Sequence, residues 1–167
     1  MQATEWLVLN ALPGLGNQRI AKLTEQSPEW PHGWLALLPG QAASELRLWL
    51  DHPGRSPLQT MLEDNLAWEA ASPRRAILHR GHSAWPGLLG EIADPPPVLW
   101  AQGDLSTLAL PGLAMVGTRH PTSEGAQNAQ AFARDFASRG WCVVSGMALG
   151  VDAMAQRAAL DTGGASI

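Results

Sequence analysis

The sequence predicts an α/β fold in which a small all-helical domain at residues 1–70 precedes a parallel sheet within residues 71–167. Two apolar runs, at 113–116 and 141–144, each break into a glycine-bearing turn with hydroxyl groups, and each turn leads into a helical pattern. Short strands that alternate with helices in this way are typical of right-handed crossovers and a parallel sheet. The helical domain is predicted by apolar residues at helical spacing, punctuated by proline and glycine.

The first domain is predicted to be built from short helices only. These helices are expected at 6–12, around 20–23, and at 34–38, 42–50 and 57–71. Pro-Gly pairs at 13–14, 39–40 and 53–54 separate them. Tryptophan is bulky and largely apolar, so we expect core filler, rather than a stacking surface for bases, from Trp6, Trp34, Trp49 and Trp68.

The elements of the second domain follow in order along residues 71–167. A strand is predicted at 76–78, a short helix at 85–92, a strand at 98–101, and a loop or short helix before the strand at 113–116. A helix at 126–139, an apolar strand at 141–144, a helix at 151–160 and a strand from 165 complete the order. Because Ile167 lies inside that last strand, we expect the sheet to be incomplete and truncated at this residue.

Composition limits the kinds of site that the chain carries. The net charge of −4 argues against indiscriminate binding of polyanions, so any anion site must be local. The single cysteine, Cys142, fits a reducing cytoplasm, which is the localisation we expect. No apolar run reaches the roughly 20 residues that span a bilayer, and no basic leader precedes one. The five histidines form no metal set, so we expect solvated side chains at His79 and His82, and neither metal nor cofactor.

The turn from Gly117 to Gly125 is a candidate anion site. Gly117 permits a sharp turn, the hydroxyl groups of Thr118 and Thr122 can donate hydrogen bonds, and Arg119 offers a fork that suits a phosphate. The turn leads into the N-terminus of a helix, whose dipole also favours an anion. An ordinary strand-to-helix loop, with Thr122 or Ser123 as the N-cap of the helix, explains the same residues equally well.

The turn from Ser145 to Asp152 is the second candidate. Its glycines, Gly146 and Gly150, lack the spacing of a dinucleotide-binding loop, and it has no lysine of the phosphate-binding P-loop kind. Simple nucleotide hydrolysis and hydride transfer therefore have no motif here. Asp152 is expected in the first turn of a helix, where a structural role is as well supported as a functional one.

Together these segments resemble the DprA/Smf family of bacterial DNA-processing proteins, over residues 83–167. The matching residues are Gly117, Thr118, Arg119, Thr122 and Gly125, then Ser145, Gly146, Ala148, Gly150 and Asp152, then Gly163 and Gly164. A lead-in from Trp85 to Gly103 matches the family as well. The three motifs occur in the family's order and spacing.

The resemblance implies a Rossmann-like core that binds single-stranded DNA without catalysing a reaction. Members of the family protect incoming strands during natural transformation and help to load the RecA recombinase. Carried over by position, the resemblance implies a phosphate site made by Gly117, Thr118, Arg119, Thr122, Gly125, Ser145, Gly146 and Gly150. Phosphate contact by amides and one arginine gives affinity with little sequence preference and a clear dependence on salt.

The first domain bears a weaker resemblance to a known DNA-binding element. The run Leu12–Ile20 looks like a helix-hairpin-helix, which makes residues 1–70 a helix-hairpin-helix or SAM-like domain. In such a hairpin, glycine-turn amides and the second helix hold a phosphate. This half carries eight acidic and four basic side chains, so we expect a structural or partner-binding domain rather than the primary DNA site.

The chain departs from the family pattern in three respects. Glu124 stands where the family often has an aromatic residue, and Gln156 stands where it commonly has a histidine. The family's core also continues through further strands and helices, which carry additional basic contacts and the usual dimer surface. A homodimer is therefore expected to depend on a part of the domain that lies outside this sequence.

Two alternatives stay open from the sequence. Related Rossmann-like folds hydrolyse nucleoside monophosphates with a Pro-Gly-Gly-x-Gly-Thr loop and a catalytic glutamate, and no such loop occurs up to Ile167. The other alternative is an inactive fragment, because an incomplete parallel sheet exposes an unpaired edge and apolar faces. We expect a binding protein, not an enzyme, whose partners are single-stranded DNA and RecA.

Overall fold

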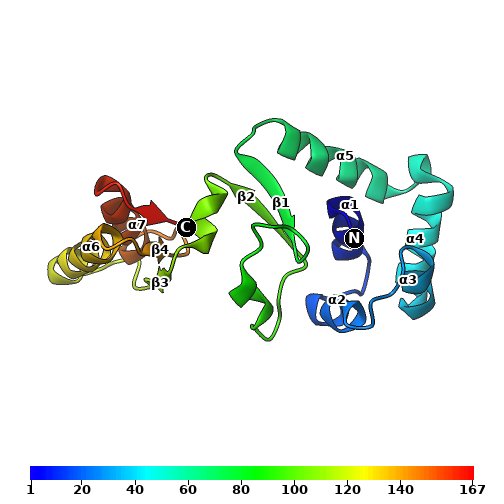
Figure 1. Ribbon diagram of the computed structural model, residues 1–167, viewed down its shortest axis with the longest axis horizontal. Coiled ribbons are helices and arrows are strands. Elements are labelled where there is room, and N and C mark those ends of the chain that lie inside the picture. Colours follow the sequence, from blue (N-terminus) through cyan, green and yellow to red (C-terminus); the bar gives the residue numbers. More distant parts are fainter. The chain divides into compact units, whose positions relative to one another are not determined.

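The computed structural model describes residues 1–167, which form two compact units, Met1–Gly103 and Asp104–Ile167 (Figure 1). The first unit is mainly helical and carries a two-stranded sheet, and the second is a parallel three-stranded sheet with two long helices. The predicted α/β class is confirmed. None of the helices combines the length and the apolar surface that crossing a bilayer requires.

The first unit begins with five helices, as the sequence predicted. They are α1 (Ala3–Ala11), α2 (Asn17–Thr24), α3 (His32–Leu37), α4 (Gly40–Asp51) and α5 (Pro57–Ala70), with a short 3-10 turn, η1 (Pro53–Arg55), before α5. The start of α5 shows why the helices begin where they do. Pro57 occupies the first helical position, and the Ser56 hydroxyl accepts a hydrogen bond of 3.2 Å from the Leu58 amide.

Helix α1 runs through the middle of the first unit's core. Four consecutive residues, Trp6, Leu7, Val8 and Leu9, are all buried, so this turn of the helix is enclosed on every side. Trp34 is also fully buried, while Trp49 and Trp68 pack against the same core from its margin. The prediction that tryptophans fill the core is confirmed for Trp6 and Trp34, while Trp49 and Trp68 are half-buried at the margin of the core.

A hairpin-like pair of strands packs on these helices (Figure 1). Strands β1 (Arg75–His79) and β2 (Val98–Gln102) are antiparallel, with Ile77 opposite Trp100, and the 3-10 turn η2 (Gly87–Gly90) lies between them in sequence. Ile77 and Val98 belong to the helical core, and the Ile77 amide donates to the Glu69 carboxylate of α5 at 2.7 Å. The two compact units therefore meet in sequence after Gly103. The domain boundary that we predict at 70/71 stays a prediction.

His79, at the end of β1, is buried, so the prediction of a solvated side chain is wrong for this residue. Its ring stacks on Trp6, with 6.1 Å between the ring centroids, and its Nδ1 accepts a hydrogen bond from the Gly81 amide at 3.1 Å. The expectation failed because a histidine's neighbours across a sheet and on a packed helix are not visible in its local sequence.

The second unit has the predicted order of strands and helices. Strands β3 (Gly112–Ala114), β4 (Cys142–Val144) and β5 (Ala165–Ser166) are parallel and adjacent in that order, connected by α6 (Ser123–Ser138) and α7 (Val151–Asp161). A 3-10 turn, η3 (Leu105–Ala109), precedes β3. Both crossovers thus run from the carboxyl end of one strand, through a helix, to the start of its neighbour.

Small side chains hold the second unit together. Helices α6 and α7 pack through alanines, and these cover the buried Val143 of β4; the alanines are Ala133, Ala137, Ala155, Ala158 and Ala159. Gly164 must also be small, since a Cβ there would lie 2.7 Å from the Ala137 Cβ. Small residues therefore let α6, α7 and the start of β5 approach one another closely.

The burial of His79 predicts a stability that depends on pH. Burial lowers the pKa of His79 below its usual value near 6.5, and the positive charges of His82 and the amino terminus lower it further. Below about pH 6.5 the unfolded chain therefore binds a proton at His79 more readily than the folded chain does. The free energy of unfolding is thus highest above about pH 6.5 and falls as the pH drops through the pKa of His79 in the folded state. Urea unfolding of the first unit at about pH 8 and about pH 5.5 should show this loss, and His79→Gln should reduce the loss. A variant with the same pH dependence as the wild type would contradict this assignment.

Candidate functional site

Two loops lie side by side at the carboxyl ends of β3 and β4. The first loop, residues 115–122, follows β3, and the second loop, residues 145–150, follows β4. The Met115 amide donates to the Val144 carbonyl at 2.9 Å, and the Ser145 hydroxyl donates to the Met115 carbonyl at 2.6 Å. Further out, the Val151 amide donates to the Thr118 carbonyl at 3.2 Å. These bonds tie the two candidate turns of the sequence into one structure.

The closest approach of the loops is at Gly150. Its φ is +85° and its ψ −130°, a combination that residues with side chains rarely adopt. A Cβ at this position would lie 2.3 Å from the Thr118 carbonyl oxygen and 2.7 Å from the Arg119 Cα. Gly117 meets the start of α7 in the same way, since a Cβ there would lie 2.8 Å from the Val151 Cβ. Gly150 is therefore required by its contact with the main chain of the first loop, and Gly117 by its contact with the Val151 side chain at the start of α7.

The first loop presents main-chain donors to solvent. The amides of Gly117, Thr118 and Arg119 donate no hydrogen bond within the chain, and all three residues are exposed. We call these three N–H groups the amide cradle. The loop leads into the N-terminus of α6, where the helix dipole adds partial positive charge. Such an arrangement suits an anion.

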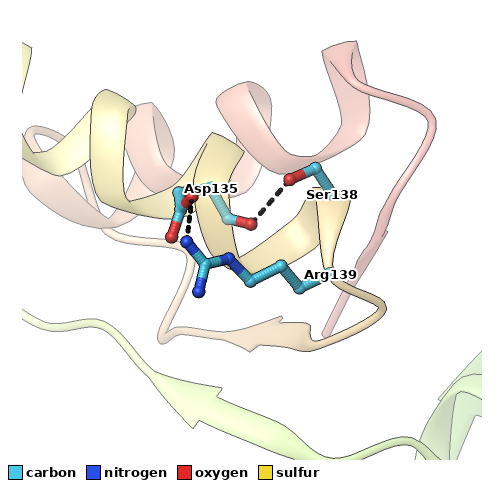
Figure 2. A network of polar contacts seen from close by, with 3 residues as sticks. All are labelled: Asp135, Ser138 and Arg139. Carbon is cyan, nitrogen blue, oxygen red and sulfur yellow. Dashed lines mark hydrogen bonds and ion pairs between the residues drawn. The ribbon is translucent and has the colours of Figure 1, made fainter.

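Arg119 adds a full charge beside the amide cradle. Its side chain is exposed and forms neither an ion pair nor a hydrogen bond within the chain. At the opposite end of α6, by contrast, Arg139 donates to the Asp135 carboxylate at 2.8 Å, next to the bond from the Ser138 hydroxyl to the Asp135 carbonyl (Figure 2). The positive charge of Arg139 is thus partly compensated, whereas that of Arg119 is free to meet a ligand.

Hydroxyl groups of the first loop shape the loop itself. The Thr122 hydroxyl accepts from the Gly125 amide at 3.1 Å and caps α6, which is the ordinary structural role that the sequence left open. The Thr118 hydroxyl accepts from the His120 amide at 3.1 Å and keeps its own proton for another acceptor. Of the two threonines, Thr118 is the one beside the amide cradle.

In the second loop, the expected site residues form internal bonds. The Ser145 hydroxyl donates its proton to Met115, and the Gly146 amide donates to Asp152 at 3.2 Å. Asp152 is buried in the first turn of α7, so its carboxylate faces this amide and the helix dipole instead of the loop's outer surface. The structural role considered for Asp152 is the one observed. Ser145 and Gly146 hold the loop in place, and Gly150 brings it against Arg119.

Two residues outside the expected set also position the loops. Val151 supplies both the amide that holds Thr118 and the side chain that covers Gly117. Gln156 donates from its side-chain amide to the carbonyls of Ser145, at 3.4 Å, and Ile167, at 3.0 Å, and so links the ends of β4 and β5. Gln156 was visible in the sequence only as a departure from the family pattern, and nothing in the sequence pointed to Val151.

Comparisons with known proteins agree on one family. Residues 76–167 match the family described as DNA recombination-mediator protein A. The DNA processing protein DprA of Bacillus subtilis is 38% identical over 84 residues, which are 50% of this chain and 28% of that protein. Protein Smf of Escherichia coli is 27% identical over 164 residues, 97% of this chain and 42% of that protein. The chain thus spans less than half the length of these relatives.

A solved structure shows the same fold. The X-ray structure of DNA processing protein A (DprA) from Streptococcus pneumoniae superposes with a TM-score of 0.70 at 23% identity. The match covers 99% of this chain and 56% of that one. At this identity the likeness concerns the fold, and it agrees with a Rossmann-like arrangement of the second unit.

The contact at Gly150 gives a testable consequence for stability. We expect Gly150→Ala to lower the free energy of unfolding of the second unit by about 2 to 4 kcal/mol, because the new methyl group meets the Thr118 carbonyl and the backbone leaves its preferred region. Gly163→Ala is the matched control: Gly163 also has a positive φ, +76°, but open space surrounds it, so only about 1 kcal/mol should be lost. Urea unfolding of both variants measures the difference. Equal losses would show that the loops do not touch at Gly150.

Proposed function

The chain belongs to the DNA recombination-mediator protein A family, and from this premise we propose that it binds single-stranded DNA through the two loops at the ends of β3 and β4. In this proposal the protein holds the strand without catalysing a reaction. The site consists of Gly117, Thr118, Arg119, Thr122, Gly125, Ser145, Gly146 and Gly150. Gly117, Thr118 and Arg119 contact phosphates through their amides, and Thr118 and Arg119 also contact them through their side chains. The other residues build and hold the loops.

One observation carries the proposal: the unpaired amides of the cradle lie next to the unpaired charge of Arg119. Main-chain amides contact phosphate oxygens without reading the base, and a guanidinium forms two parallel hydrogen bonds to a phosphate. An exposed amide already has water as a partner, so exchange of that water for a charged oxygen strengthens the bond. This set of donors favours a phosphodiester backbone of any sequence.

The net charge of the chain agrees with a local site. The chain as a whole is acidic, with a net charge of −4, so long-range electrostatic attraction of DNA to the whole surface is not expected. Binding must then come from the few donors at the loop edge. Glu124 lies in the first turn of α6 and opposes an anion there, which limits the affinity and makes the contribution of Arg119 more important.

The family description, a recombination mediator, supports a finer proposal for the biological role. We propose that the protein protects incoming single strands during natural transformation and assists the loading of RecA onto them. A homodimer is part of the same proposal. The chain spans less than half of its curated relatives, so these roles are proposed for the protein as a member of its family.

Arg119→Ala tests the proposed phosphate contact. We expect the dissociation constant for a fluorescent oligo-dT to rise about tenfold at low salt, because a charge-assisted hydrogen bond is lost. The slope of log affinity against log salt should become shallower by about 0.7, the value for one phosphate of a single strand. Fluorescence anisotropy over a salt series measures both quantities, and urea unfolding confirms that the variant folds.

Arg139→Ala is the control for this experiment. It removes the same charge from the other end of α6, where Asp135 already pairs with it. The affinity should change by less than about twofold, because an exposed, compensated charge contributes little. If both substitutions weaken binding equally, the DNA does not occupy the amide cradle.

A further inference from the structure

The most exposed large apolar side chains of the second unit all lie on the two loops. Val116 in the first loop is 79% exposed, and Met147 and Leu149 in the second loop are 82% and 75% exposed. Elsewhere in this unit the highest value is 60%, for Phe132. Single exposed apolar residues are ordinary on protein surfaces, whereas here three lie on two loops that are bonded to one another. We call Val116, Met147 and Leu149 the apolar rim.

Packing within the chain does not account for the apolar rim. Met147 adopts a φ of +57°, a region that residues other than glycine seldom occupy, and yet its side chain is almost fully in solvent. Val116 directly precedes the amide cradle, and Leu149 directly precedes Gly150, which touches Arg119. The rim and the cradle are therefore parts of the same loops.

We infer that the apolar rim contacts the unpaired bases of the strand whose phosphates occupy the amide cradle. This inference rests on the proposed function and adds what the protein recognises besides phosphate. Each base of a nucleic acid is joined to its phosphate through a single sugar, so a phosphate held in the cradle brings its base to the loops. Bases have apolar faces that a single strand exposes and a duplex hides by stacking and pairing.

The chemistry of the loops favours this occupant over a protein surface. An apolar protein patch would cover the rim but would leave the amides and Arg119 without an anion. A single strand of nucleic acid supplies both phosphates and apolar faces at short, regular intervals. The rim is aliphatic and offers neither edge-reading polar groups nor an aromatic ring, so it distinguishes single from double strands and not one base from another.

The test compares oligo-dT with an abasic strand of the same length, which keeps the phosphates and lacks the bases. The wild type should bind oligo-dT about tenfold more tightly than the abasic strand, as expected for a few base contacts. The double variant Met147→Ala/Leu149→Ala should lose this preference, with weaker binding of oligo-dT and unchanged binding of the abasic strand. The control Phe132→Ala/Leu160→Ala removes two exposed apolar side chains from α6 and α7 and should keep the preference.

Each other outcome overturns the inference in a recognisable way. Equal wild-type affinity for the two strands, with Arg119→Ala weakening both, overturns the base contact and leaves the phosphate site standing. No binding of either strand overturns the proposed function together with the inference. If vesicles of anionic lipid bind the wild type and not the rim variant, while both bind oligo-dT equally, the rim meets a membrane and not bases. A wild-type dimer that the rim variant converts to a monomer, with unchanged DNA affinity, would assign the rim to a second copy.

Discussion

The contact between Gly150 and the Thr118–Arg119 backbone is the constraint on which the candidate site depends. Two parallel neighbouring strands bring their carboxyl ends to one edge, but this alone leaves the loops free to diverge. Only a glycine lets the second loop press against the main chain of the first, at a distance where no side chain fits. The start of α7 is thereby fixed against Thr118, and the amides of the first loop remain on the outside. If the loops were further apart, the charge of Arg119 and the residues of the second loop would lie on separate surfaces.

Within this site, most polar groups hold the loops and a few are left for a ligand. Ser145, Gly146 and Asp152 use their hydrogen-bonding capacity within the chain, and Thr122 caps α6. A buried or partly buried polar group is costly unless it is paired, so these bonds keep the loops in a single conformation. The exposed amides of the first loop pay no such cost in water. The structure therefore separates residues that build the site from those that can contact DNA, although the family motif contains both.

The sequence predicted the strands and helices well because their signals are local. Short apolar runs located β3, β4 and β5, and helical patterns between them located α6 and α7. Thr122, which caps α6, was one of the two residues named as its cap. The placement of β1 and β2 was not predictable in this way. Their apolar residues Ile77 and Val98 fit any buried face, and only the tertiary structure shows that this face belongs to the helical core. The pressing of Gly150 onto Thr118 is likewise a contact between residues distant in sequence, which the glycine alone does not reveal.

Each of the two units has its own hydrophobic core, one built on α1 and one on the alanines of α6 and α7. Multi-domain proteins commonly depart from two-state unfolding, and two separate cores can unfold at different temperatures or denaturant concentrations. Where the two cores unfold at different points, a single midpoint fitted to the whole signal averages two transitions. All eight tryptophans belong to either the first unit or, for Trp141, the second, so their fluorescence reports mainly on the helical unit. The alanine-packed unit that carries the loops would melt almost silently by that probe.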